Sequence, residues 1–135
     1  SIIFAVGFIE IVRNQPLGYV GTFLLILSYI SLIAIGVFPS SAGRIHSYVT
    51  VAFFTLEPLA LFFIGTALIQ KSEIYLGIFT ILLAALSVGI WAFWFQGPQF
   101  GPRIGLAKPE FTSSLIFSIW SIVFGTRLFK QAKKL

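Results

Sequence analysis

Four apolar stretches, each long enough to cross a bilayer, constrain this chain more than any other feature of its sequence. They run over Leu17–Phe38, about Ser47–Ile69, Ile74–Phe95 and about Phe111–Phe129. At 1.5 Å per helical residue, stretches of about 20 residues cover a hydrocarbon core of roughly 30 Å. Hydrophobic residues make up 58% of the chain and charged residues only 10%, a composition that a soluble domain does not have. The sequence therefore predicts an all-α integral membrane bundle, with one domain over residues 1–135.

A fifth apolar stretch, Ile2–Val12, is too short to cross a bilayer, because its eleven residues cover only about 17 Å as a helix. The chain contains no Met, and Ser1 leads directly into this stretch. We therefore expect it to be the second half of a spanning helix that starts outside this sequence. A signal peptide is not indicated, because the stretch carries Glu10 and has no basic start.

The Lys and Arg residues divide unevenly between the two ends of the predicted helices. One side holds Arg13, Lys71, Arg127, Lys130, Lys133 and Lys134, and the other holds Arg44, Arg103 and Lys108. The richer side of a membrane protein usually faces the cytoplasm. We therefore expect a multi-pass protein of the cell membrane with a cytoplasmic C-terminus, and the loops Pro39–His46 and Gln96–Glu110 on the outer face.

Small residues recur at helical spacing in two of the predicted helices, as Gly77, Thr80, Ala84 and Ser87 and as Ser114, Ser118, Ser121 and Gly125. Such stripes let helix backbones approach closely in lipid, so both are expected to be packing faces. The alternative for Ser and Thr is a hydrogen bond back to their own helix.

The residue types that are missing exclude several classes of site. The chain has no Cys, no Met, no Asp and one His, so we expect no disulfide, thiolate site, metal site or haem held by two protein side chains, and no cofactor. The Gly- and Pro-containing loop 97–102 has no phosphate-binding pattern. The net charge of +5 belongs mostly to residues that flank apolar stretches, which predicts contact with lipid headgroups rather than with nucleic acid.

Glu57 is the most unusual polar residue, because it lies about ten residues into an apolar stretch and precedes Pro58. A carboxyl at that depth is expected to be uncharged, paired or facing a cavity. One interpretation is a proton or ligand site. The other is a structural hydrogen bond to a Ser, Thr or Tyr of a neighbouring helix, for example Tyr29. Near the inner end, Glu10 and Arg13 are spaced to form an ion pair on one helix face.

Four polar residues, Arg44, His46, Arg103 and Glu110, fall on the predicted outer loops or their helix junctions. Together they could bind an anionic headgroup or carry out acid–base chemistry, and we expect His46 to lie within reach of Glu110. Their spacing is not diagnostic, however. Glu110 and His46 could equally act only at helix boundaries, where a carboxylate near a helix start is favourable.

Two segments resemble the membrane protein family called "domain of unknown function 998". They are IGVFPSSAGRIHSYVTVAFF (Ile35–Phe54) and GLAKPEFTSSLIFSIWSIVFGTRLF (Gly105–Phe129), and the opening Ser-Ile-Ile-Phe is similar to the start of the family's second helix. The resemblance implies a six-helix bundle whose first helix and part of the second lie outside this sequence. The family pattern falls on Gly36, Phe38, Pro39, His46, Pro109 and Glu110. It implies no function.

Three functions are compatible with these patterns. The first is a non-catalytic accessory or scaffolding subunit of a larger membrane complex, with lipids and other membrane subunits as partners. The second is a lipid-handling protein or enzyme that uses the outer-face group, which closeness of His46 to Glu110 would favour. The third is a proton-coupled carrier, which a polar cavity reaching Glu57 would favour.

Overall fold

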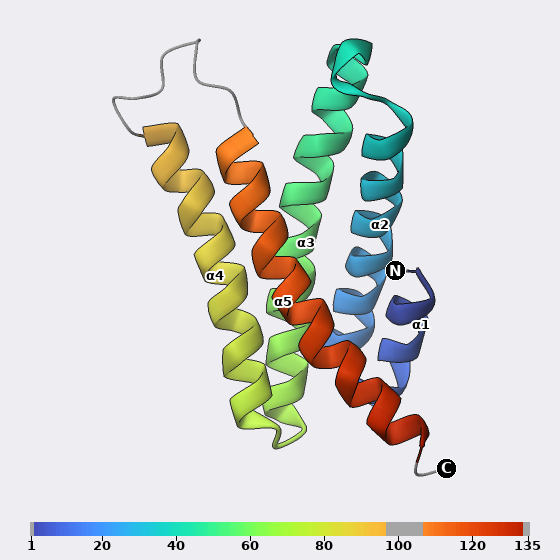
Figure 1. Ribbon diagram of the computed structural model, residues 1–135. Helices are drawn as coiled ribbons and strands as arrows, with labels where there is room; N and C mark the ends of the chain where they lie inside the picture. The colour runs from blue at the N-terminus through green and yellow to red at the C-terminus, as the bar shows by residue number, and fades with distance from the viewer. Residues whose placement is uncertain (1, 97–106, 134–135) are drawn as a thin grey trace.

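The computed structural model describes residues 2–96 and 107–133, and within these ranges the chain forms α-helices and no strand (Figure 1). The helices are α1 (Ile2–Ile11), α2 (Pro16–Val37), α3 (Arg44–Gln70), α4 (Ile74–Gln96) and α5 (Ala107–Ala132), with a 3-10 turn at Ser40–Ala42. The last four helices are long and apolar enough to cross a membrane, and α1 is shorter. The predicted all-α membrane bundle is confirmed.

Two helices begin a few residues earlier than the apolar pattern predicts. Helix α3 begins at Arg44, directly after Gly43. The φ of Gly43 is 64°, which turns the chain before the helix and causes no strain, because glycine has no Cβ. Helix α5 begins at Ala107, so that Pro109 lies in its first turn, where its missing N–H costs no helical hydrogen bond. Polar residues that the sequence assigned to loops, such as His46, are therefore held on rigid helix.

The helices pack in chain order, with the most extensive contact between α2 and α3 and further contacts of α3 with α4 and α4 with α5. Helix α5 runs obliquely across the bundle and meets α1 in the lower half of Figure 1. An aromatic cluster fills this junction: the Phe8 ring lies 5.2 Å from Trp120 and 5.0 Å from Phe124, centroid to centroid. The Trp120 indole also donates to the Thr80 hydroxyl at 3.1 Å, which links α5 to α4.

The two predicted stripes of small residues behave differently. On α4 all four members are buried, and a Cβ built on Gly77 would lie 2.6 Å from the Gly65 carbonyl oxygen of α3. The α4 stripe is therefore a packing face. For α5 the prediction holds for only half of the stripe. Ser121 and Gly125 are half-buried, and a Cβ built on Gly125 would lie 3.9 Å from the Phe4 ring of α1. Ser114 and Ser118 are exposed, and the Ser118 hydroxyl donates to its own helix at the Ser114 carbonyl, at 2.9 Å. Bulkier side chains, including Phe117 and Trp120, form the buried face instead.

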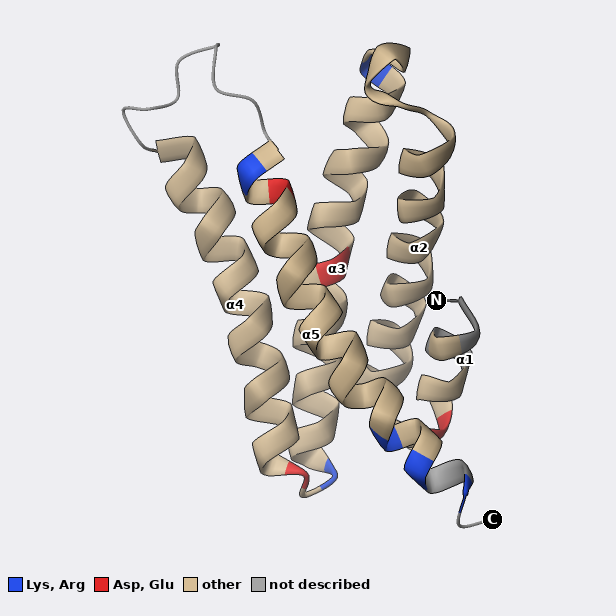
Figure 2. Cartoon of the chain, in the orientation of Figure 1, with Lys and Arg blue, Asp and Glu red and all other residues tan. Residues whose placement is uncertain are grey.

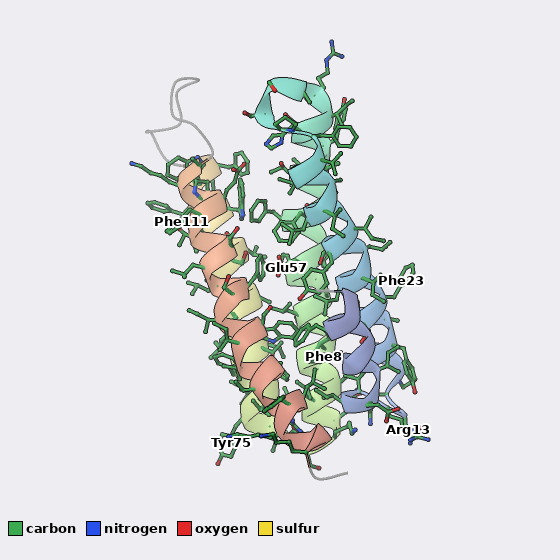
Figure 3. All side chains as sticks on the ribbon, turned by 45° about the vertical axis from the view of Figure 1, so that its right-hand side comes forward. Phe8, Arg13, Phe23, Glu57, Tyr75 and Phe111 are labelled. Atoms are coloured by element: carbon green, nitrogen blue, oxygen red, sulfur yellow. The ribbon has the colours of Figure 1, made fainter. Side chains whose placement is uncertain are left out.

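The sides of the bundle carry large apolar side chains that point outward (Figure 3). Phe23, Tyr75 and Phe111 point away from the helices, whereas Phe8 and Glu57 point into the bundle. In water such a surface would drive association. Around spanning helices it is the surface that contacts lipid tails.

The described charged residues gather at the two ends of the bundle, apart from Glu57 (Figure 2). We call them the His46 end, which carries Arg44, Lys108 and Glu110, and the Arg127 end, which carries the remaining described charges. At the Arg127 end, Arg127 of α5 forms a bidentate ion pair with Glu73 at the start of α4. The predicted ion pair between Glu10 and Arg13 is present, at 3.7 Å. The Lys71 ammonium donates to the Ile11 carbonyl at 2.7 Å. Which end faces the cytoplasm stays a prediction.

Candidate functional site

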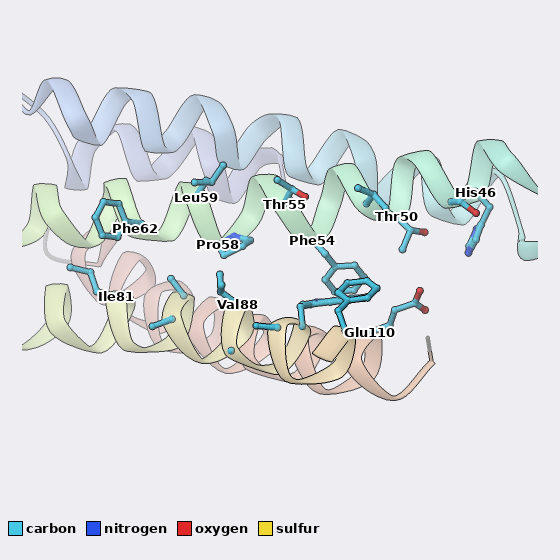
Figure 4. A pocket seen from close by; sticks show the side chains of 18 residues that line it. His46, Thr50, Phe54, Thr55, Pro58, Leu59, Phe62, Ile81, Val88 and Glu110 are labelled. Atoms are coloured by element: carbon cyan, nitrogen blue, oxygen red, sulfur yellow. The ribbon is translucent and has the colours of Figure 1, made fainter. Parts of the chain in front are cut away.

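A groove of about 940 Å³ lies between α3 and α4 toward the His46 end (Figure 4). The two helices touch at Gly65 and Gly77, near the Arg127 end, where the absence of side chains brings their backbones together. Closer to the His46 end the facing residues include Phe54, Ile81 and Trp91, and the space between the helices forms the cavity. We call it the α3–α4 groove. Its volume lies within the roughly 300–1,000 Å³ of typical small-molecule sites.

The wall of the α3–α4 groove is mostly apolar and opens on the side of the bundle. Val51, Leu59 and Phe62 of α3 and Val88 and Phe95 of α4 line the groove and are also exposed. The helices on both sides of the opening are apolar enough to span a membrane, and the surface of such helices suits contact with lipid tails.

Polar residues line the groove mainly at its His46 end. His46, Ser47 and Thr50 come from the first two turns of α3, and Glu110 comes from the first turn of α5 (Figure 4). The negative charge of Glu110 suits that position, because a helix start carries partial positive charge. The groove is therefore amphipathic along its length, with polar groups toward one end and a hydrocarbon-like wall beyond them.

The His46 ring is fixed by a hydrogen bond of its Nδ1 to the Phe38 carbonyl, at 2.7 Å, which joins the start of α3 to the end of α2. A carbonyl only accepts hydrogen bonds, so Nδ1 carries a proton. The neutral ring then presents Nε2 as an acceptor, and the protonated ring presents it as a donor. His46 thus has the boundary role that the sequence suggested, and it retains one nitrogen for a ligand in the groove.

Two further polar groups in the groove wall were not found by sequence reasoning. The Thr50 hydroxyl and the Trp91 indole N–H are buried, and neither has a hydrogen-bond partner in the described part of the chain. Buried polar groups are normally paired, since an unpaired one costs about 1–3 kcal/mol. An isolated Thr or Trp in an apolar stretch gives no signal in a sequence, because only the packing of α3 and α4 places both residues in the wall of one groove.

The four predicted outer-face residues are placed in three different ways. His46 and Glu110 line the same groove, although no ion pair joins them within residues 2–96 and 107–133. Arg44 is exposed at the first position of α3 and does not line the groove. Arg103 lies outside the described residues. A role for these residues in binding or catalysis stays a prediction.

Glu57 is buried in the bundle, as predicted, with only 1% of its surface exposed. Glu57 interacts electrostatically with Tyr29 of α2, but its buried oxygen Oε2 has no hydrogen-bond partner within the described residues. The predicted hydrogen bond between Glu57 and Tyr29 therefore stays a prediction. Although the adjacent Pro58 lines the α3–α4 groove, Glu57 does not, and the groove wall is mostly apolar. The groove is therefore not the polar cavity reaching Glu57 that would have favoured the carrier hypothesis.

No group of three His, Asp or Glu side chains that could hold a metal ion occurs in the described ranges. Comparison with known proteins shows that residues 1–127 match the family model described as "Protein of unknown function (DUF998)". No curated protein and no solved structure matches the chain.

Proposed function

The chain belongs to the family described as protein of unknown function (DUF998), and since that family supplies no activity, we propose from the geometry that this member binds a membrane lipid. One acyl chain lies in the α3–α4 groove, and the headgroup lies at the His46 end. The observation that carries the proposal is the amphipathic groove itself, which is apolar along most of its wall, polar toward one end and open to the side.

The polar groups of the groove match the parts of a lipid in order. His46 and Glu110, near the helix ends, suit a headgroup that carries a phosphate together with an amine or hydroxyl. Thr50 lies six residues into α3, about 9 Å below its start. Thr50 and Trp91 thus line the groove at the depth where the ester groups of a phospholipid lie, although the Thr50 hydroxyl and the Trp91 N–H are themselves buried.

Photo-crosslinking tests the proposal. The protein is reconstituted into vesicles that contain a phosphatidylcholine with a photoreactive group in one chain, and the labelled residues are mapped by mass spectrometry. We expect labels concentrated on groove residues such as Leu59 and Val88, and fewer labels on outward residues of α2 such as Phe23. Labels spread evenly over the exposed apolar residues would contradict a specific site.

A groove-filling variant sharpens this test. Ala92 lines the groove and is exposed, so Ala92→Trp should fill its upper part and lower groove labelling roughly ten-fold, the loss that follows from removing about 1.4 kcal/mol of contact. The matched control is Gly36→Trp, since a Cβ at Gly36 meets no atom within 4 Å and Gly36 does not line the groove. Equal labelling of both variants would argue against the site.

A second candidate, the accessory or scaffolding subunit, is favoured by one observation. Helix α5 exposes Ser114 and Ser118 beside apolar residues such as Phe111 and Leu115, and small residues permit close approach of another spanning helix. The two functions use different surfaces. Ser114→Phe should weaken association with a membrane partner and leave groove labelling unchanged. Ala92→Trp should lower groove labelling and leave that association unchanged.

A further inference from the structure

A second groove, of about 450 Å³, lies on the other side of α4, between α4 and α5. Leu86, Ile90 and Phe93 of α4 line it together with the first turns of α5, including Lys108. We call it the α4–α5 groove. Like the first groove it is mostly apolar, and it too reaches the His46 end.

The two grooves are continuous across the lipid-facing side of α4. Ala85 and Gly89 line both of them and are exposed. These residues are four apart, so they lie one above the other on one face of the helix. A Cβ built on Gly89 would meet no atom within 4 Å, which shows that the space beside it is open. Ala85 and Gly89 therefore form a low saddle between two apolar grooves.

The saddle lies at a suitable depth for the branch point of a lipid. Gly89 is seven residues from the end of α4, about 10 Å at 1.5 Å per residue. Trp91 and Trp94 lie between Gly89 and the end of α4, and Trp is enriched at the interface between headgroups and hydrocarbon. A glycerol backbone above the saddle would have one apolar groove on each side of it.

The charges at the tops of the two grooves complement a phospholipid headgroup. Lys108 lines the α4–α5 groove and Glu110 the α3–α4 groove, and both belong to the first turns of α5. A lysine ammonium binds phosphate as a point charge. On the side of the first groove, the carboxylate of Glu110 and Nε2 of His46 suit the hydroxyl or amine of the same headgroup.

The geometry points to a phospholipid with two acyl chains that straddles α4, with one chain in each groove, the chains diverging over Ala85 and Gly89, and the phosphate beside Lys108. This inference rests on the proposed function and names its ligand class. A single-chain lipid would fill only one of the two connected grooves and would leave the other without a ligand chain.

The test uses two photoreactive probes in phosphatidylcholine vesicles: a two-chain phosphatidylglycerol with a photoreactive group in each chain, and the lysophosphatidylglycerol with one such chain. With the unmodified sequence, the two-chain probe should label both grooves, for example at Leu59 and at Ile90. In Gly89→Phe the new ring occupies the saddle. We then expect labelling of the α4–α5 groove by the two-chain probe to fall roughly ten-fold. Gly36→Phe, which lies in neither groove, should leave the labelling of both grooves by either probe unchanged.

The variants are chosen so that a folding defect does not imitate the result. Gly89→Phe adds a side chain into open space and replaces glycine with a better helix former, so its melting midpoint in detergent should not fall. Ala85→Phe fills the same saddle from a second position, and Gly36→Phe adds the same bulk on α2, away from both grooves. Only the two saddle variants should change the labelling.

Two outcomes overturn this inference and one overturns its premise. If Gly89→Phe and Ala85→Phe leave labelling of the α4–α5 groove unchanged, or if both probes label the two grooves alike, the ligand does not straddle α4. In either case labels in the α3–α4 groove would still support lipid binding. If no probe labels the α3–α4 groove, the proposed function itself fails.

Discussion

At the scale of single residues, the position of Glu57 is explained by its neighbours rather than by its depth alone. The side chain is buried between helices, close to Tyr29, and the oxygen Oε2 has no hydrogen-bond partner within the described residues. In an apolar bundle such a carboxyl persists only where neighbouring polar groups compensate for the loss of water. Tyr29 is a neighbouring polar group with which Glu57 interacts.

Substitution of Glu57 tests this account. Glu57→Gln keeps the size of the side chain and its hydrogen-bonding capacity, and should lower the free energy of unfolding by less than about 1.5 kcal/mol. Glu57→Lys places an unpaired ammonium in the bundle and should cost about 3 kcal/mol or more. Thermal unfolding in mild detergent measures both. If the Glu57→Lys variant had the same melting midpoint as the original protein, the side chain would not be buried.

At the scale of helices, the contact between α3 and α4 determines the shape of the groove. Gly65 and Gly77 allow the two backbones to touch, whereas the larger side chains closer to the His46 end, such as Phe54 and Trp91, stand between the helices and line the groove. The Phe54 and Trp91 rings, one from each wall, lie 5.0 Å apart, centroid to centroid. The groove therefore depends on a close contact at one point and bulky walls at another.

Two glycine substitutions in the same helix should have opposite effects. Gly77→Ala puts a Cβ 2.6 Å from the Gly65 carbonyl oxygen, so the helices must move apart, at a cost of about 1–3 kcal/mol. Gly89→Ala meets no atom and should stabilise the protein by up to about 1 kcal/mol, because alanine is the better helix former. Equal melting midpoints for the two variants would contradict the close contact of α3 and α4.

At the scale of the whole molecule, the charged residues define two ends of the bundle but do not place either end in a cell. The Arg127 end carries more of the described basic residues, and there Arg127 and Glu73 join α5 to α4 while Lys71 joins α3 to α1. The His46 end carries the polar mouths of both grooves. The orientation of the chain therefore decides which leaflet would supply the proposed lipid.

We expect the C-terminus to be cytoplasmic, because six basic residues in the sequence fall on its side and three on the other. The grooves would then open toward the outer leaflet. A tag placed after Leu135 should be inaccessible to protease in sealed cells and accessible after permeabilisation. Cleavage of the tag in sealed cells would invert the orientation and would assign the grooves to the inner leaflet.

The sequence by itself determined that the chain is a membrane helical bundle, since apolar stretches of spanning length have few other ways to fold. The sequence also predicted the bounds of the helices to within a few residues, the burial of the α4 stripe and of Glu57, and the family to which the chain belongs. The sequence did not determine which face of each helix points into the bundle. Ser114 and Ser118 of α5 were assigned to a packing face and are exposed. In lipid both faces of a helix are apolar, so hydrophobicity does not distinguish the inner face from the outer one. Only the tertiary structure decided which helices touch and which separate, and both grooves arise where they separate.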